Sequence, residues 1–207
     1  TAAEIFQRAE LVIKVKEPQA VERAQLHDSL TLFTYLHLAP DLPQTEELMS
    51  SGAICLAYET VTDARGRLPL LAPMSEVAGR MSVQAGAMCL EKSHGGRGML
   101  LGGGPGTHQG KVVILGGGVV GHNAAQMAVG MGANVTIIDK SVDVLRDLDA
   151  RFGNRIQALY STRDAILEEV LAADLVIGAV LVPGASAPKL VTREMVTEMK
   201  RGAVLVD

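Results

Sequence analysis

The chain has 207 residues, which is enough for one large domain or two small ones. Its formal net charge is -4 with both signs mixed along the sequence, so it lacks the basic surface expected of a nucleic-acid-binding protein. Hydrophobic residues form 48% of the chain and aromatic residues only 3%, which predicts an aliphatic core, yet no apolar stretch reaches the roughly 18 to 20 residues of a membrane span.

The first part of the chain alternates between helix-compatible segments and short apolar strands. After an opening helix, we expect strands at 11–15, 31–35 and 53–58, with helices near 19–26 and 45–49 that Pro18 and Pro43 delimit. Such alternation predicts a parallel α/β sheet, in which ligand sites lie at the carboxyl ends of the strands.

Polar side chains follow each of these three strands. Lys16, with Glu17 after it, follows the first strand, His37 the second and Glu59 the third. In a parallel sheet a cation, an imidazole and a carboxylate would therefore meet at one rim. Each also has an ordinary interpretation, namely a solvated lysine, a core histidine between two leucines and a loop acid. Both interpretations stay open at this point.

A long helix is expected over 75–90, and it would suit a link between two domains. Ser75 and Glu76 would stand in its first turn as a cap and a favourable acid, and Gly79 would let another element approach closely. We place a partial substrate domain at 1–70 and a nucleotide-binding domain at 71–207.

The glycine-rich loop over 95–110 resembles a phosphate loop only superficially. Pro105 stands where the Walker motif needs glycine, and Val112 where it needs Ser or Thr, so ATP hydrolysis is disfavoured.

The most informative segment begins at the apolar strand 111–115. It continues as Gly116-x-Gly118-x-x-Gly121, a helix, and a second strand that ends at Asp139. The three glycines permit a tight turn, a close backbone approach to a pyrophosphate and packing of the helix on the sheet, and the helix N-terminus receives the phosphates.

Asp139 lies 23 residues beyond Gly116, where a carboxylate accepts hydrogen bonds from the adenosine ribose hydroxyls. Because a 2'-phosphate would meet a like charge, NAD is predicted rather than NADP, with the neighbouring Lys140 as a reservation. The alternative is an ordinary glycine-rich turn.

The strand and helix alternation continues to the end of the chain. Expected helices cover 142–152, 163–172 and 193–199, and expected strands cover 156–159, 175–179 and 203–206. These strands complete five strands of a Rossmann-type doubly wound parallel sheet. Ser161 follows the third of them and could contact adenine or cap the next helix, and the backbone after the fourth, from Val180, would lie near the cofactor.

The two ends of the sequence predict a piece of a longer polypeptide. The chain begins at Thr1 without Met, and it stops in an apolar strand whose unpaired edge would invite association. Two cysteines without a Cys-x-x-Cys motif, together with the lack of a signal-peptide pattern, indicate reduced thiols in the cytoplasm.

Several long stretches resemble bacterial L-alanine dehydrogenase, and the resemblance covers essentially the whole chain. They are 14–18, 32–38, 57–60, 68–80 and 173–184. The resemblance implies an enzyme that uses NAD to deaminate L-alanine oxidatively to pyruvate and ammonia, or the reverse. It also implies a homo-oligomer, which is a hexamer in the family.

The same resemblance assigns roles to individual residues. Lys16 would contact the substrate, His37 would be the catalytic acid/base and Glu59 a candidate supporting residue, while no metal ligand is implied. NAD contacts, besides the three fingerprint glycines, would be Ser75, Val119, Val120, Asp139, Ser161, Val180 and Leu181.

The expected chemistry suits these residue types. Hydride leaves the alpha carbon, water attacks the resulting imine, and protons move near neutral pH, which suits an imidazole of unperturbed pKa about 6.5. A lysine ammonium can polarise a carbonyl or hold a carboxylate. Family members have a substrate-binding arginine before this stretch and a second catalytic aspartate after it, and they carry a lysine where this chain has Val144.

Two other functions compete with this interpretation. The nucleotide-binding alpha subunit of a proton-translocating transhydrogenase shares both subdomains, but it does not need Lys16 and His37 together. A non-catalytic NAD-binding regulator would tolerate a truncated substrate site.

Overall fold

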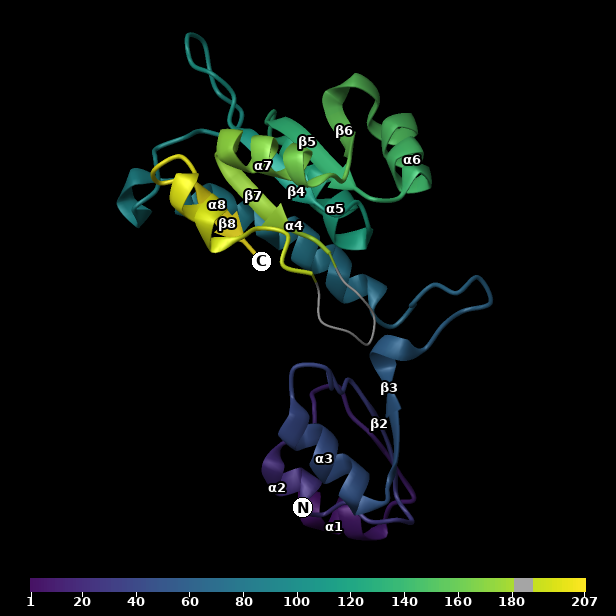
Figure 1. Ribbon diagram of the computed structural model, residues 1–207. Helices are drawn as coiled ribbons and strands as arrows, with labels where there is room; N and C mark the ends of the chain where they lie inside the picture. The colour runs from purple at the N-terminus through teal and green to yellow at the C-terminus, as the bar shows by residue number, and fades with distance from the viewer. Residues whose placement is uncertain (181–187) are drawn as a thin grey trace. The chain divides into compact units, whose positions relative to one another are not determined.

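The computed structural model describes residues 1–180 and 188–207, which form two compact units. The first unit covers Thr1–Pro73, and the second covers the described residues from Met74 onward (Figure 1). Within the described residues no helix is both long and apolar enough to cross a membrane.

The first unit is built on a three-stranded parallel sheet in the order β1-β2-β3. Its elements are α1 (Ala2–Arg8), β1 (Leu11–Ile13), α2 (Ala20–Arg23), β2 (Thr31–Thr34), α3 (Leu42–Ser51), β3 (Ile54–Ala57) and the 3-10 turn η1 (Tyr58–Thr60). Phe6 of α1 and Leu48 of α3 pack with Val12 and Leu32 in one buried cluster. Helices α1 and α3 therefore pack on one face of the sheet.

The opposite face of this sheet is apolar but exposed. The exposed residues alternate with the buried Val12 in β1 and with partly buried residues in β3, and each is about half exposed or more; they are Leu11, Ile13, Ile54 and Leu56. Parallel sheets are usually covered on both faces, so this face is an unusual feature of the unit.

Two helices of the first unit differ from the sequence expectation. α3 begins at Leu42, because Asp41 caps it by accepting the Gln44 amide, and Pro43 lies inside the first turn, where it needs no hydrogen-bond partner. The expected helix over 19–26 shrinks to the four residues of α2.

The second unit contains a five-stranded parallel sheet in the order β6-β5-β4-β7-β8. Its elements are β4 (Lys111–Leu115), α5 (Val119–Gly130), β5 (Asn134–Asp139), α6 (Val142–Phe152), η3 (Gly153–Arg155), β6 (Ile156–Tyr160), α7 (Arg163–Ala172), β7 (Leu175–Gly178), α8 (Arg193–Glu198) and β8 (Val204–Val206). The chain winds outward from β4 first to one side and then to the other. This confirms the doubly wound α/β fold.

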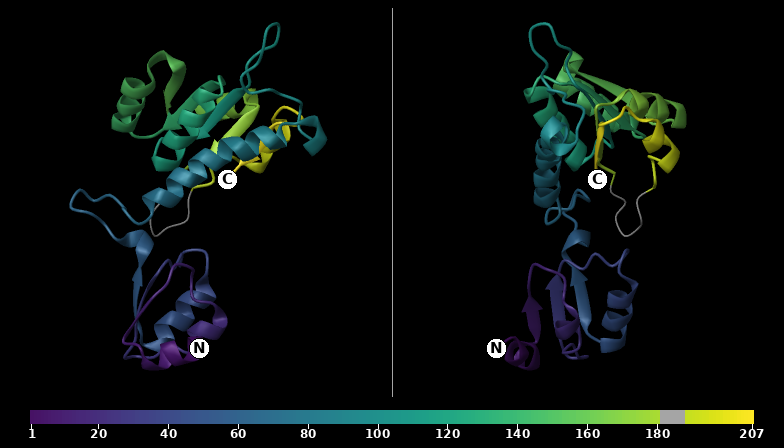
Figure 2. Two further views of the ribbon diagram at one scale, coloured as in Figure 1. Left: turned by 180° about the vertical axis from the view of Figure 1, so that it is seen from behind. Right: turned by 90° about the vertical axis from the view of Figure 1, so that its left-hand side faces the viewer.

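Helices lie on both faces of this sheet (Figure 2). Ala124, Ala125 and Leu148 of α5 and α6 share one core cluster with Ile114 and Ile137, and residues of α4 join them. The second cluster joins α7 and α8 to the other face of the strands. The switch in winding direction falls between β4 and β7, where ligands of such sheets bind.

The long helix α4 (Ala72–Cys89) starts three residues earlier than expected and is followed by η2 (Lys92–His94). Ser75 is therefore not its cap, and Glu76 falls outside its first turn, so the capping prediction is wrong. Gly79 does permit a close approach, because a Cβ there would stand 2.2 Å from the Val120 carbonyl oxygen of α5.

Candidate functional site

The carboxyl ends of β1 and β2 bring three charged or titratable side chains into contact. The Lys16 ammonium lies 2.7 Å from one oxygen of Glu17, and Nδ1 of His37 is bonded to the other oxygen. Glu17 thus bridges the cation and the imidazole that the sequence places at this rim.

Glu59, at the end of β3, holds the backbone that carries His37. Its carboxylate accepts the amides of His37 at 2.6 Å and of Leu36 at 3.1 Å, and Gln44 donates to the Leu36 carbonyl. His37 has a φ of 48°, the left-handed conformation that side chains other than glycine rarely adopt. Glu59 therefore acts on the backbone of His37 and not on its ring.

Further contacts position the same segment. The Thr34 hydroxyl donates to the carbonyls of Val15 and Lys16, which ties the exit of β1 to β2. The Tyr35 ring stacks parallel to the His37 ring at 5.8 Å between centroids. The rim is thus held by backbone and side-chain contacts from all three strands.

Exposure and charge differ sharply among these residues. Lys16 is 79% exposed and His37 43%, whereas Glu17 is only 18% exposed. Burial by itself raises the pKa of Glu17, but hydrogen bonds from Lys16, from its own backbone and from His37 outweigh it and hold that pKa at about 2. Glu17 is therefore a carboxylate at neutral pH, and His37 is not a core histidine.

The carboxyl edge of the second sheet carries the glycine-rich turn between β4 and α5. Gly116 has a φ of 103°, and a Cβ on Gly121 would lie 1.8 Å from the Gly116 carbonyl oxygen. A Cβ on Gly118, by contrast, would meet no atom within 4 Å. The backbone of Gly118, at the N-terminus of α5, therefore borders open space, and helix N-termini favour anionic groups.

Asp139 closes this turn from the end of β5. Its two oxygens accept the amides of Gly117 at 2.7 Å and Ser141 at 2.8 Å, which leaves each oxygen a further lone pair for a ribose hydroxyl. The Ser161 amide donates to the Asp139 carbonyl, which brings the two residues together. Thr162, and not Ser161, caps α7, so the capping alternative for Ser161 is wrong.

The other residues named for cofactor contact lie around the same turn. Val119 and Val120 begin α5, and the Val180 side chain lies 2.9 Å from the Cβ position of Gly116. Leu181 lies outside the described residues. Val144 packs beside the turn, since one of its methyl groups lies 2.7 Å from the Cβ position of Gly117.

Ser75 reaches this region through the packing of α4. Gly79 contacts Val120, and Arg80 donates to Asn123 at 3.1 Å, so α4 and α5 run in the same direction. Ser75, one turn before Gly79, therefore lies toward the N-terminal end of α5. Its expected cofactor contact remains a proposal.

Sequence reasoning assigned no role to Glu17 or Ser141. Glu17 follows Lys16 directly at a strand end, and this adjacency is the signal that could have singled it out. The hydrogen bond from the Ser141 amide to Asp139 depends on the conformation of the turn after β5, and the sequence holds no comparable signal for that turn.

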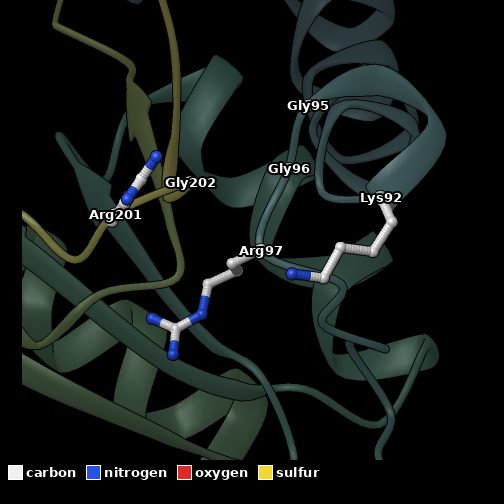
Figure 3. A pocket seen from close by; sticks show the side chains of 6 residues that line it. All are labelled: Lys92, Gly95, Gly96, Arg97, Arg201 and Gly202. Carbon is white, nitrogen blue, oxygen red and sulfur yellow. The ribbon is translucent and has the colours of Figure 1, made fainter.

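A basic pocket of about 510 Å³ lies at the opposite edge of the second sheet (Figure 3). It is lined by Lys92, Arg97 and Arg201 with three glycines. The Arg97 guanidinium is paired with Asp174 at 2.9 Å, and the three cationic groups do not converge on one point. The pocket therefore offers no ready anion site.

Known proteins resemble this chain over its whole length. The family model "Alanine dehydrogenase/PNT, N-terminal domain" matches residues 1–78, and the C-terminal domain model of that family matches 82–207. Alanine dehydrogenases of Halomonas elongata and Mycolicibacterium smegmatis are 58% and 56% identical over 99% and 100% of the chain. The chain spans about half of those relatives, 55% and 56% of their lengths.

Solved structures give the same picture. An L-alanine dehydrogenase matches with a TM-score of 0.86 and 52% identity over 99% of this chain and 56% of that one. A transhydrogenase from Sinorhizobium meliloti matches with a TM-score of 0.77 and 25% identity over 99% of this chain and 60% of that one.

Proposed function

The chain belongs to the alanine dehydrogenase/PNT family, and on this premise we propose that the whole protein deaminates L-alanine oxidatively with NAD, giving pyruvate, ammonia and NADH, and runs the reverse amination. The contact of Lys16, Glu17 and His37 at one rim carries the proposal. These residues supply the cation and the proton carrier that amino-acid deamination requires.

In this proposal the second unit holds the cofactor. Gly118 admits the pyrophosphate, Gly116 and Gly121 shape the turn, and Asp139 accepts the ribose hydroxyls with the lone pairs that the backbone amides leave free. Bound NAD supplies the hydride acceptor. The remaining proposed contacts are Ser75, Val119, Val120, Ser161, Val180 and Leu181.

The first unit performs the proton chemistry. Lys16, exposed at the rim, holds the substrate carboxylate or polarises the pyruvate carbonyl as a point charge. His37 takes a proton from the water that attacks the imine and returns it as ammonia departs. Because Nδ1 is bonded to Glu17, proton exchange with substrate falls to Nε2.

The domain roles and the assembly are part of the same proposal. Residues 1–70 would be the partial substrate domain and 71–207 the NAD-binding domain of a cytoplasmic homo-hexamer. Val77, Met81 and Met88 leave an apolar stripe exposed along α4, which suits a subunit interface. Native mass spectrometry of the whole protein tests the subunit number.

A transhydrogenase subunit is the second candidate, because the Sinorhizobium meliloti transhydrogenase matches 99% of the chain. The test is alanine-dependent NADH formation by the whole protein, followed at the NADH absorbance, beside hydride exchange between NAD(H) and NADP(H). Alanine-dependent NADH formation supports the dehydrogenase. Hydride exchange between the nucleotides without alanine-dependent NADH formation would indicate a transhydrogenase subunit and overturn the proposal. NAD binding with neither activity would indicate a regulator.

A further inference from the structure

Glu17 is the least exposed of the three side chains at the rim and contacts both of the others. Its oxygens are divided between two partners, with Oε2 on the Lys16 ammonium and Oε1 on Nδ1 of His37. A carboxylate bonded to one ring nitrogen of a histidine fixes which nitrogen carries the proton, because the carboxylate accepts and cannot donate.

Among the described residues around His37, Glu17 is the group that can make this selection. Glu59 accepts hydrogen bonds from the backbone amides of Leu36 and His37, and the Tyr35 ring stacks on the face of the imidazole. The Lys16 ammonium makes its ion pair with Glu17.

We infer that Glu17 is a positioning residue for the reaction: it holds His37 as the Nδ1–H tautomer and presents the bare Nε2 to the substrate. Its catalytic meaning rests on the proposed function. The tautomer is a property of the chain itself and can be measured without turnover.

Replacement of Glu17 by neutral glutamine should release this selection. A glutamine can either accept a hydrogen bond from Nδ1–H or donate one to a bare Nδ1, so it does not select a tautomer.

The first experiment is nitrogen-15 NMR of the histidine rings in the 207-residue chain, with the His37 signals assigned by their loss in His37→Gln. In the neutral imidazole, wild type should show Nδ1 protonated and Nε2 bare. Glu17→Gln should show a mixture of both tautomers. Unchanged backbone amide spectra away from the rim establish that the variant is folded.

Glu22→Gln is the matched control. Glu22 has a similar exposure of 22% and is likewise paired with a lysine, Lys14 at 2.5 Å, but within the described residues no hydrogen bond or ion pair joins it to His37. Its replacement should leave the tautomer of His37 unchanged. Equal behaviour of Glu17→Gln and Glu22→Gln would overturn the inference.

The second experiment measures alanine turnover by the whole protein. Glu17→Gln should lower kcat by about tenfold to a hundredfold and leave the KM for NAD unchanged. A protein without alanine activity that still shows the NMR difference would defeat the proposed function and not the tautomer selection. A normal kcat in Glu17→Gln would defeat the role of Glu17 in catalysis.

Discussion

His37 combines two features that separate it from a structural histidine. Its backbone holds a φ of 48°, and its ring is bonded through Nδ1 to a carboxylate. Strained backbone of this kind persists only where surrounding contacts enforce it, and here those contacts come from Glu59. At the scale of single residues, the contacts at the rim therefore hold both the backbone of His37 and one nitrogen of its ring.

The role of His37 is tested by its removal. In the whole protein, His37→Ala should lower turnover of alanine by about 10² to 10⁴, the range for loss of a general acid/base, and leave NAD affinity nearly unchanged. Lys16→Ala should raise the KM for alanine as well as lower kcat. Steady-state kinetics from pH 6 to 9 test both variants. A wild-type rate for His37→Ala would mean that another group transfers the proton.

Asp139 is expected to set the choice between NAD and NADP. Asp139→Ala should weaken NAD binding by about 1.5 to 3 kcal/mol and narrow the gap between the two nucleotides. Because Asp139 also accepts the Gly117 and Ser141 amides, the variant should be less stable without cofactor. Calorimetric titration with both nucleotides tests this, and Asp143→Ala, an 89% exposed acid nearby, serves as the control. An unchanged preference would remove the role given to Asp139.

Two glycines of the same turn should respond oppositely to a side chain. Gly118→Val places its Cβ in open space, so the chain should fold with a normal melting temperature but show no rise in it on NAD addition. Gly121→Ala meets the Gly116 carbonyl oxygen at 1.8 Å and should lower the melting temperature itself. Thermal unfolding with and without NAD compares them, and an ordinary NAD-induced rise in Gly118→Val would place the phosphates elsewhere.

At the scale of elements, the sequence predicted some helix bounds fully and missed others for identifiable reasons. The helices over 142–152 and 163–172 match α6 and α7, where Ser141 and Thr162 supply side-chain caps. α3 and α4 start earlier than expected, and each carries a proline in its first turn. Pro43, which the sequence analysis takes as a boundary, thus stands just inside α3.

The candidate site was predictable only in part. Strand ends located Lys16, His37 and Asp139, because residues that follow parallel strands share one edge. The bridge through Glu17 was not predictable, since alternation along a strand fixes the face of a residue but not which oxygen meets which nitrogen. The left-handed backbone of His37 likewise depends on Glu59, which is 22 positions away in the sequence.

Packing of α4 on α5 depends on the missing side chain of Gly79. Gly79→Ala would place a methyl 2.2 Å from the Val120 carbonyl oxygen and should destabilise the second unit by about 1 to 3 kcal/mol. Gly130→Ala, at the end of α5 with open space around it, should be neutral or stabilising. Chemical unfolding of both variants tests the contrast, and equal stabilities would mean that α4 can shift without cost.

For the whole molecule, the depressed pKa of Glu17 predicts sensitivity to acid. The folded pKa of about 2 lies below the ordinary 4.5, so the stabilisation is present above pH 4.5 and is lost as the pH falls through about 2. Glu17→Gln should be less stable than wild type at neutral pH, and its stability should fall less between pH 4.5 and about 2. The replacement of an exposed acid, Glu46→Gln, should leave the acid transition like that of wild type. The chain has no Trp and three Tyr, of which Tyr35 and Tyr58 lie in the first unit, so near-ultraviolet circular dichroism reports on it. Parallel acid transitions for all three proteins would contradict the prediction.

The bare face of the three-stranded sheet has a practical consequence for handling the 207-residue chain. Its exposed side chains form an apolar surface that favours association with other apolar surfaces; they are Leu11, Ile13, Ile54 and Leu56. Such a surface should bind hydrophobic dyes and keep chaperones bound through purification. Light scattering by a concentrated sample should rise with temperature as the chain associates. Mild detergent, or Lys in place of Ile13 and Ile54, should keep the preparation monodisperse.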